Sequence, residues 1–337
     1  MKFSLPINPK MTPEFISNDF IPFLLKYREN IIDLYFTVYL PPFEQDAMGM
    51  FFNKEDIPNI VANALIISEE TGIPVSPTFN NIHISPSYEN LKLFINNFKP
   101  LYKMGIRRIT IPFTSWMLFG DIKREFPDIY IKNTVLQQVK TPQQLFDLFD
   151  AGFDYINIDQ SLVRSQKIIG KMYEVKQKCQ KIKNKKLSLS ILYNENCLGN
   201  CPIQFEHFLF NTQNDSKVPF FKSSMNCISC TQWEKEDDSY FLKTNSIIDT
   251  PEFMIGFNNI DVFKLHGRES MNVLANSMNI IKAYHEGYIV LDKIQQFKQQ
   301  IDEDLFSSWI SKIKDCGFEC WDCNICDEIL RKKQWQN

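Results

Sequence analysis

The cysteines of this chain fall mainly into two groups whose spacing is typical of metal binding. The carboxyl-terminal group is found in the run FECWDCNICDE and just before it, and comprises Cys316, Cys320, Cys323 and Cys326. Thiolates at three- and four-residue steps can converge on one point, and four soft ligands suit an iron–sulfur cluster or a tetrahedral zinc ion. Structural zinc sites more often use two Cys-x-x-Cys pairs with a longer spacer, so the dense run favours a 4Fe–4S cluster, with zinc as the alternative.

The second group combines Cys197 and Cys201, in ENCLGNC, with Cys227 and Cys230, in NCISC. Two such pairs with an intervening loop predict a second four-thiolate site, and their spacing fits zinc and iron–sulfur alike. Cys179 stands alone in a helix-like stretch and is predicted to be a buried apolar thiol.

Composition agrees with metal binding in a reducing compartment. The chain has 337 residues, a formal charge of -3 and nine cysteines, an odd number that fits poorly with full disulfide pairing. The amino-terminal segment lacks a long apolar run, and no run reaches the roughly 18–20 apolar residues of a membrane span. We therefore expect a cytoplasmic protein that does not enter a membrane.

Short apolar segments alternate with helix-like ones along the chain, a pattern that predicts a parallel sheet. The expected strands are Asp33–Tyr39, Ile73–Phe79, Arg107–Pro112, Asp128–Thr134, Phe153–Asp159, Lys186–Tyr193, Asn245–Asp249 and Asp261–Leu265. Eight strands predict a TIM-like (β/α)₈ barrel. An open doubly wound sheet is the runner-up, but no Gly-rich turn follows the first strand.

This assignment divides the chain into two parts. Residues 1–287 form the barrel, with a long cysteine-bearing loop at 194–244 after the sixth strand, and residues 288–337 form a helical, cysteine-rich, metal-binding extension. A loop of that length is usually functional, and loops after barrel strands line the catalytic face.

Three segments resemble motifs of the peptidase U-32 family, also called collagenase-like peptidases. LYNENCLGNCPIQFEHFLFN, from Leu192 to Asn211, resembles the family's cysteine motif, and IDVFKLHGRES, from Ile260 to Ser270, resembles its second signature. Between them, IIDTPEFM resembles the family's Pro-Glu turn. The chain has His266 before Gly267, where the family signature has a small residue. The cysteine-rich tail is similar to those of some poorly characterised members.

The resemblance implies a barrel that holds one 4Fe–4S cluster, and the cysteine spacing of the tail predicts a second one there. Its better-understood members are UbiU and UbiV, which work as a pair, and proteins that hydroxylate tRNA or ribosomal RNA bases. They support oxygen-independent hydroxylation, with prephenate implicated as a donor. The expected function is therefore an iron–sulfur hydroxylase or oxidoreductase acting on a nucleobase, a quinone precursor or a peptide. A homologous or heterologous protein partner is a further implication.

Several polar residues at predicted strand ends are candidates for substrate binding. Alternation places Lys264, His266 and Arg268 on one side of the last strand, where Arg268 would bind a phosphate or carboxylate. The other candidates are Asn80, Asn133, Asn194, Glu195 and His207.

Two other functions remain open at this stage. A peptidase would accord with the family name, although the chain has no Gly-x-Ser-x-Gly elbow and no His-Glu-x-x-His zinc site. A non-catalytic, metal-stabilised subunit of a hetero-oligomer is the other. Radical SAM chemistry is disfavoured because the tail spacing lies beyond the barrel.

Overall fold

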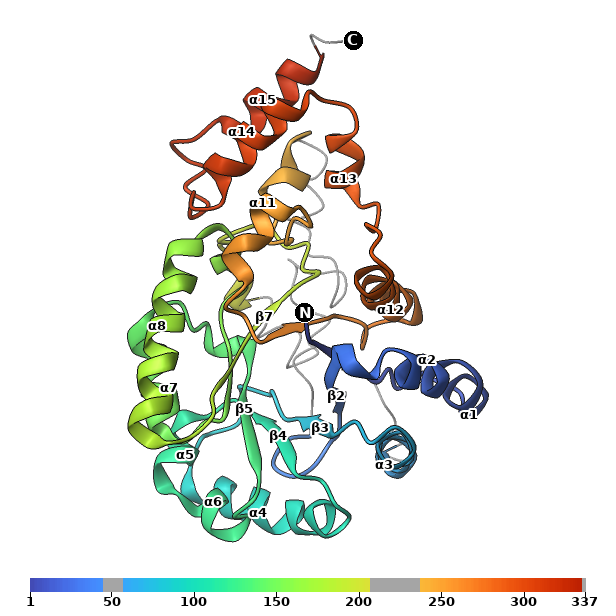
Figure 1. The fold of residues 1–337 in the computed structure, drawn as a ribbon. Helices are drawn as coiled ribbons and strands as arrows, with labels where there is room; N and C mark the ends of the chain where they lie inside the picture. The colour runs from blue at the N-terminus through green and yellow to red at the C-terminus, as the bar shows by residue number, and fades with distance from the viewer. Residues whose placement is uncertain (45–56, 207–236, 335–337) are drawn as a thin grey trace.

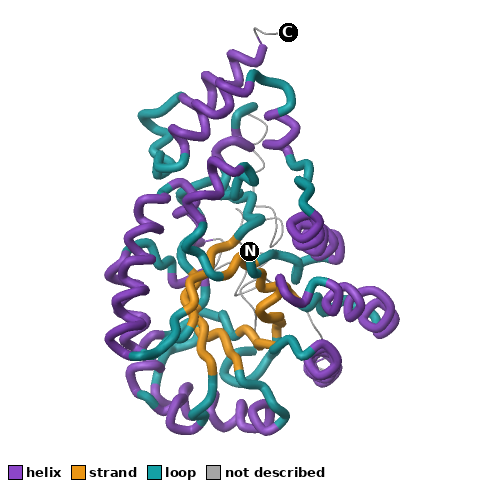
Figure 2. The backbone as a smooth tube through the Cα atoms, viewed as in Figure 1, coloured by secondary structure: helices purple, strands orange, loops and turns teal. Residues whose placement is uncertain are grey.

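The structure is a closed barrel of eight parallel strands surrounded by helices, as predicted. It is a computed structural model that describes residues 1–44, 57–206 and 237–334. Each strand pairs with its sequence neighbours, and β8 pairs with β1 to close the ring. The strands gather in the middle of the lower part of Figure 2, with helices on the outside. This arrangement is the (β/α)₈ fold.

The strands are short, and most of their residues are buried. They are β1 (Phe3–Pro6), β2 (Ile31–Thr37), β3 (Val75–Thr78), β4 (Arg108–Ile111), β5 (Tyr130–Asn133), β6 (Tyr155–Asn157), β7 (Ser188–Leu192) and β8 (Val262–Lys264).

The predicted strand assignment needs two corrections. The first strand is Phe3–Pro6, which the sequence analysis missed, and the predicted strand Asn245–Asp249 is a loop segment. The side chains of Ile247 and Ile248 are buried in that loop, which explains the error, because burial alone makes an apolar run look like a strand. The long cysteine-bearing loop therefore follows the seventh strand, and not the sixth.

The helices lie between the strands and after them. The α-helices are α1 (Pro13–Phe15), α2 (Ile21–Lys26), α3 (Ile57–Thr71), α4 (Tyr88–Lys103), α5 (Thr114–Phe119), α6 (Asp121–Glu125), α7 (Pro142–Ala151), α8 (Gln166–Lys183), α11 (Pro251–Met254), α12 (Met271–Glu286), α13 (Lys293–Lys298), α14 (Glu303–Ile313) and α15 (Ile325–Gln334). The shorter helical turns are η1 (Ile16–Phe20), η2 (Arg28–Asn30), η4 (Val135–Gln137), η5 (Gln160–Arg164), η6 (Tyr240–Lys243) and η7 (Ile255–Phe257). Among the described helices, none combines the length and apolar character that a membrane span needs.

Helix α7 shows how the sequence sets these boundaries. The Thr141 side chain caps the first turn, and Gln144 completes a capping box. Pro142 occupies the first helical position, and Gly152 ends the helix in the left-handed conformation at φ 113°. These are the start and stop signals that the sequence predicts.

The barrel interior contains a buried ionic network. Asp33 on β2 and Lys132 on β5 belong to strands that are not neighbours, yet Lys132 Nζ lies 2.5 Å from Asp33 Oδ2. Arg108 Nη1 lies 3.2 Å from the same carboxylate oxygen, and Ser4 Oγ donates to the other at 2.5 Å. The barrel interior is therefore held partly by charge, in addition to the apolar contacts between strands and helices.

The carboxyl-terminal helices pack on one end of the molecule. In Figure 1, α14 and α15 lie beyond α11, at the opposite end of the view from α4 and α6. The backbone N–H of Gln166 donates to the Lys314 carbonyl oxygen at 3.1 Å, which joins the start of α8 to the end of α14. Buried Phe306 and Trp309 give α14 an apolar side. The tail is therefore attached to the barrel by both backbone and apolar contacts.

Candidate functional site

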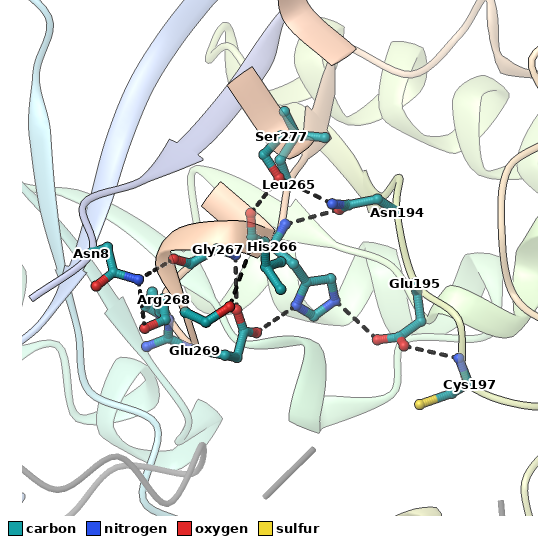
Figure 3. Close-up of polar contacts among 12 residues, drawn as sticks. Asn8, Asn194, Glu195, Cys197, Leu265, His266, Gly267, Arg268, Glu269 and Ser277 are labelled. Atoms are coloured by element: carbon teal, nitrogen blue, oxygen red, sulfur yellow. Dashed lines mark hydrogen bonds and ion pairs between the residues drawn. The ribbon is translucent and has the colours of Figure 1, made fainter. Parts of the chain in front are cut away.

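The candidate site lies where β7 and β8 end. Asn194 and Glu195 follow β7, and His266 follows β8, so parallel pairing brings them to the same rim of the barrel. This rim is the catalytic face in TIM-barrel enzymes. Figure 3 shows these side chains converging from the two chain segments.

His266 is held between two carboxylates. Its Nδ1 lies 2.9 Å from Glu269 Oε1, and its Nε2 lies 3.0 Å from Glu195 Oε2. Both ring nitrogens are donors only in the imidazolium form, so this geometry selects the charged ring. Glu269 was not among the predicted residues, although its position three residues after His266 was a usable signal.

The pKa values follow from that arrangement. Burial alone would lower the pKa of His266, but the carboxylates of Glu195 and Glu269 raise it to about 10. Burial alone would raise the pKa of each carboxylate, whereas His266 lowers both to about 2. The three residues are therefore all charged near neutral pH, with a net charge of one negative unit.

This trio also positions the cysteine loop. Glu195 Oε1 accepts a hydrogen bond from the Cys197 backbone N–H at 3.0 Å. Asn194 Oδ1 accepts from the His266 backbone N–H at 2.9 Å, and Asn194 Nδ2 donates to Ser277 Oγ at 3.0 Å. Asn194 and Glu195 thus tie the start of the loop to the end of β8.

Arg268 points in another direction from His266 (Figure 3). Its Nη1 donates to Thr37 Oγ1 at 2.7 Å, and its guanidinium lies over the Tyr35 ring, 5.3 Å from the centroid. Lys264 lies over the same ring at 4.5 Å. The prediction that all three cations share one side is therefore wrong, because the chain leaves β8 after Lys264 and Gly267 adopts φ 144°.

An amide from the first strand's loop fixes this turn. Asn8 Nδ2 donates to the carbonyl oxygens of Gly267 and Arg268, at 2.7 and 3.1 Å. A Cβ on Gly267 would lie 2.9 Å from the Leu274 Cα and from Pro6, so the position has no room for a side chain. Asn8 was also missed, because nothing in its local sequence indicates a contact with residues so far along the chain.

The remaining predicted substrate residues follow or end other strands, or lie outside the described residues. Asn80 is buried just after β3. Asn133 is buried at the end of β5 and exchanges hydrogen bonds with Asn157 of β6, including Asn157 N to Asn133 Oδ1 at 2.5 Å. His207 lies outside the described residues, so its predicted role stays a prediction.

Two of the four loop cysteines are described. Cys197 and Cys201 are partly exposed, whereas Cys227 and Cys230 lie outside the described residues. The Asn245 backbone N–H donates to the Cys197 carbonyl oxygen at 2.8 Å, and Gly199 N donates to Lys243 O at 3.0 Å. The start of the loop, at Cys197 and Gly199, therefore lies beside its end, at Lys243 and Asn245.

All four tail cysteines line one pocket. They are Cys316, Cys320, Cys323 and Cys326. Arg164, at the end of η5, and Lys243, at the end of η6, line the same pocket. These thiols are free, and Cys320 is the exposed one. Across the described ranges, no three Cys, His, Asp or Glu side chains converge closely enough to hold a single ion as they stand.

The two cysteine segments lie against each other. Asn200 Nδ2 donates to the Gly317 carbonyl oxygen at 2.8 Å, which links the segment between Cys197 and Cys201 to the one between Cys316 and Cys320. Both segments border a cleft of about 510 Å³, beside Lys243 and the exposed Trp321. The tail is therefore part of the same face of the molecule as the barrel rim.

Comparison with known proteins agrees with this description. No protein-family model matches the chain. An uncharacterized protease, MJ1657, of Methanocaldococcus jannaschii is 27% identical over 189 residues, which is 52% of this chain and 52% of that protein. The match thus spans about half the length of that relative. The structure of the U32 peptidase Mk0906 superposes with a TM-score of 0.50 and 13% identity, over 79% of this chain and 93% of that one.

Fold and site together define a TIM-barrel protein with cysteine-bearing segments at its functional rim. The structural likeness to Mk0906 shows the shared fold. The sequence likeness to the archaeal protease covers about half of each chain, and the motifs at Leu192–Asn211 and Ile260–Ser270 resemble those of the peptidase U32 family.

Proposed function

We propose that this chain is a U32-type iron–sulfur oxidoreductase that performs or assists an oxygen-independent hydroxylation or oxidation at the barrel rim. The observation that carries the proposal is the meeting of two cysteine-bearing segments on this rim, marked by the Asn200–Gly317 hydrogen bond. A redox cofactor placed there would lie beside the loops that bind substrates in barrels of this type.

The loop residues fit an iron–sulfur cluster by the chemistry of their donors. Cys197 and Cys201 lie on a segment anchored by Glu195, and Cys227 and Cys230 would complete a four-thiolate set. A bound 4Fe–4S cluster would supply single-electron transfer to the reaction. Zinc is the alternative occupant of the same ligand set.

Arg268 would bind the anionic group of a donor or substrate. Its guanidinium is buried against Tyr35 and oriented by Thr37, so little side-chain entropy remains to be lost on binding a carboxylate. A small dicarboxylate such as prephenate suits this residue. The acceptor would be a nucleobase, a quinone precursor or a peptide.

His266 would act as a positioning residue. Because both ring nitrogens contact carboxylates and its pKa lies near 10, it keeps its proton across the neutral range. Its contribution would be to hold Glu195, and through it the Cys197 backbone, at a fixed place on the rim.

The same geometry weighs against a peptidase that uses His266. A general base needs an unoccupied nitrogen to accept a proton from a serine or cysteine, and His266 has none. The names of the two relatives are the support for a peptidase. A metal-stabilised subunit that acts with a second protein is compatible with the same cysteine arrangement.

The direct test is oxygen-free isolation followed by measurement of iron, sulfide and zinc. Cys197→Ser should remove the loop's share of iron, and Cys179→Ala, whose thiol is buried away from both groups, should not. Arg268→Gln should raise the prephenate concentration needed for a given thermal stabilisation about ten-fold. Arg107→Gln changes an exposed arginine that pairs with Asp128, and it should leave that concentration unchanged. Peptide hydrolysis that persists in Cys197→Ser protein lacking iron would contradict the proposal.

A further inference from the structure

We propose that Cys316, Cys320, Cys323 and Cys326 hold a dianionic tetrathiolate metal centre whose charge is balanced by the buried guanidinium of Arg164. This centre would fasten the carboxyl-terminal helices to the barrel. The inference goes beyond the oxidoreductase proposal and does not depend on it, because none of its ligands belongs to the loop group.

The first observation is an uncompensated buried cation. Arg164 is 1% exposed, and no carboxylate of the described residues pairs with it. Its Nη2 donates to the Leu242 carbonyl oxygen at 3.3 Å, while its Nη1 has no hydrogen-bond partner in the described part of the chain. A guanidinium stays protonated in proteins, so its burial without an anion is costly.

Aromatic rings surround this cation but supply no negative charge. The guanidinium carbon lies 5.3 Å from the Phe253 ring centroid, 5.7 Å from that of Phe318 and 5.8 Å from that of Trp309. Cation–π contacts of this kind offset part of the desolvation cost. The remaining side of Arg164 faces the pocket lined by the four tail thiols.

The second observation is that hydrogen-bond donors already face the sulfurs. The backbone N–H of Phe318 and the guanidinium of Arg164 both lie beside the Cys316 thiol. The indole N–H of Trp309 faces the Cys326 thiol and has no other partner among the described residues. Donors aimed at sulfur are the usual outer contacts of metal-bound thiolates.

The backbone between the first two cysteines is also shaped for a compact site. Gly317 and Phe318 both have positive φ, 59° and 58°, which is uncommon for a phenylalanine. The Gly317 backbone N–H donates to the Arg164 carbonyl oxygen at 2.8 Å. This tight turn brings the segment of Cys316 and Cys320 onto the arginine that would balance its charge.

The charge argument holds for either metal chemistry. Four thiolates around Zn²⁺ and four thiolates around an oxidised 4Fe–4S core both leave two net negative charges, and either set forms as the thiols release their protons. The shared chemistry is therefore a tetrathiolate dianion beside a guanidinium. The sulfurs border a pocket, and binding would draw them onto the metal.

The location indicates what the centre would do. Arg164 belongs to the segment after β6, Leu242 and Lys243 to the end of the long loop, and the cysteines to the tail. The ion pair from Lys243 to Asp327, at 3.1 Å, already joins the last two segments, and Lys243 also pairs with Asp237 of its own segment at 2.7 Å. A metal here would be bound by the tail alone, and its negative charge would hold the tail against Arg164 and the end of the long loop.

The test uses the full chain isolated without oxygen, with iron, sulfide and zinc measured per chain. Cys320→Ser changes an exposed residue, so the variant should fold. It should lose the metal of the tail centre, whereas Cys197→Ser should keep that metal. Iron with sulfide would identify a cluster, and zinc without sulfide a single ion. Arg164→Met should lose this metal at chelator concentrations at least about ten-fold lower than those that strip the wild type. Arg164→Lys, which keeps the charge, should restore part of the retention.

Arg107→Met is the matched control, because Arg107 is an exposed arginine and pairs with a carboxylate. It should leave metal retention unchanged. If Arg164→Met does not fold, Arg164→Lys is compared with wild type for thermal stability with and without chelator. Unchanged metal content in Cys320→Ser, or equal chelator resistance in Arg164→Met and wild type, would overturn the inference.

Discussion

The Asn200 side-chain amide donates a 2.8 Å hydrogen bond to the Gly317 carbonyl oxygen, and this contact joins the two cysteine groups. Each of these residues lies between two cysteines of its own group. The loop after β7 and the carboxyl-terminal tail therefore meet at the segments that carry their thiols, and changes in one are expected to reach the other.

Gly199 should be a sensitive point of this contact. A Cβ at Gly199 would lie 2.1 Å from Cδ1 of the Phe318 ring, so alanine must displace the ring or the loop. Overpacking of this kind costs roughly 1–3 kcal/mol. We expect Gly199→Ala to lower the free energy of unfolding by about that amount and to make the tail more accessible to protease, as chemical denaturation and limited proteolysis would show.

Gly170→Ala is the control for that substitution. Gly170 lies within α8, and a Cβ there would meet nothing within 4 Å. Alanine in a helix is favoured over glycine by about 0.5–1 kcal/mol, so this variant should be slightly more stable than wild type. Equal stability of the Gly199→Ala variant and wild type would contradict the packing of Phe318 on the loop.

His266 should make stability depend on pH. Its pKa rises from 6.5 to about 10 on folding, so its contribution is full below about pH 6.5 and is lost as pH rises toward 10. Glu269, lowered from 4.5 to about 2, contributes fully above about pH 4.5 and loses its contribution as pH falls toward 2. The stabilisation from this cluster should therefore be greatest between about pH 4.5 and 6.5.

Replacing His266 should remove this dependence. His266→Gln leaves two buried carboxylates without a counter-charge, and we expect a loss of roughly 3–5 kcal/mol near pH 6. Denaturant unfolding across the pH range should show a difference from wild type that shrinks steadily above pH 7. Glu269→Gln removes one of the two carboxylates and should move that decline to lower pH. A difference that stays constant from pH 6 to pH 10 would refute the assignment of a charged His266.

The ionic network inside the barrel should matter for stability but not for metal content. Asp33 and Lys132 are both almost fully buried, and Asp33→Asn would leave Lys132 without its carboxylate. Breaking such a pair from one side costs roughly 3–5 kcal/mol. The double variant Asp33→Asn, Lys132→Met should recover part of this loss. Metal per folded chain should equal that of wild type in both, and a drop in metal would show that the network reaches the cysteine sites.

Much of the fold could be predicted from the sequence because its signals are local. The capping residues around α7 and the βα alternation depend on neighbours within a few residues. The strand Phe3–Pro6 was missed because four residues next to the terminus carry too little pattern. Asn245–Asp249 was mistaken for a strand because its isoleucines are buried although the segment is a loop.

The site could be predicted only in part, for a different reason. Asn194, Glu195 and His266 are brought together by pairing of β7 with β8, which strand order makes foreseeable. The direction of Arg268 depends on a turn at Gly267 that strand alternation does not describe. Arg164 approaches the tail thiols across more than a hundred residues of chain, and its own sequence context gives no sign of that contact.

The most direct test of this account is the metal and sulfide content of protein isolated without oxygen. The account predicts iron and sulfide on the loop cysteines, removed by Cys197→Ser, and a separate tetrathiolate metal in the tail, removed by Cys320→Ser. Wild-type protein that is isolated without metal, and in which thiol titration detects every cysteine, would contradict it.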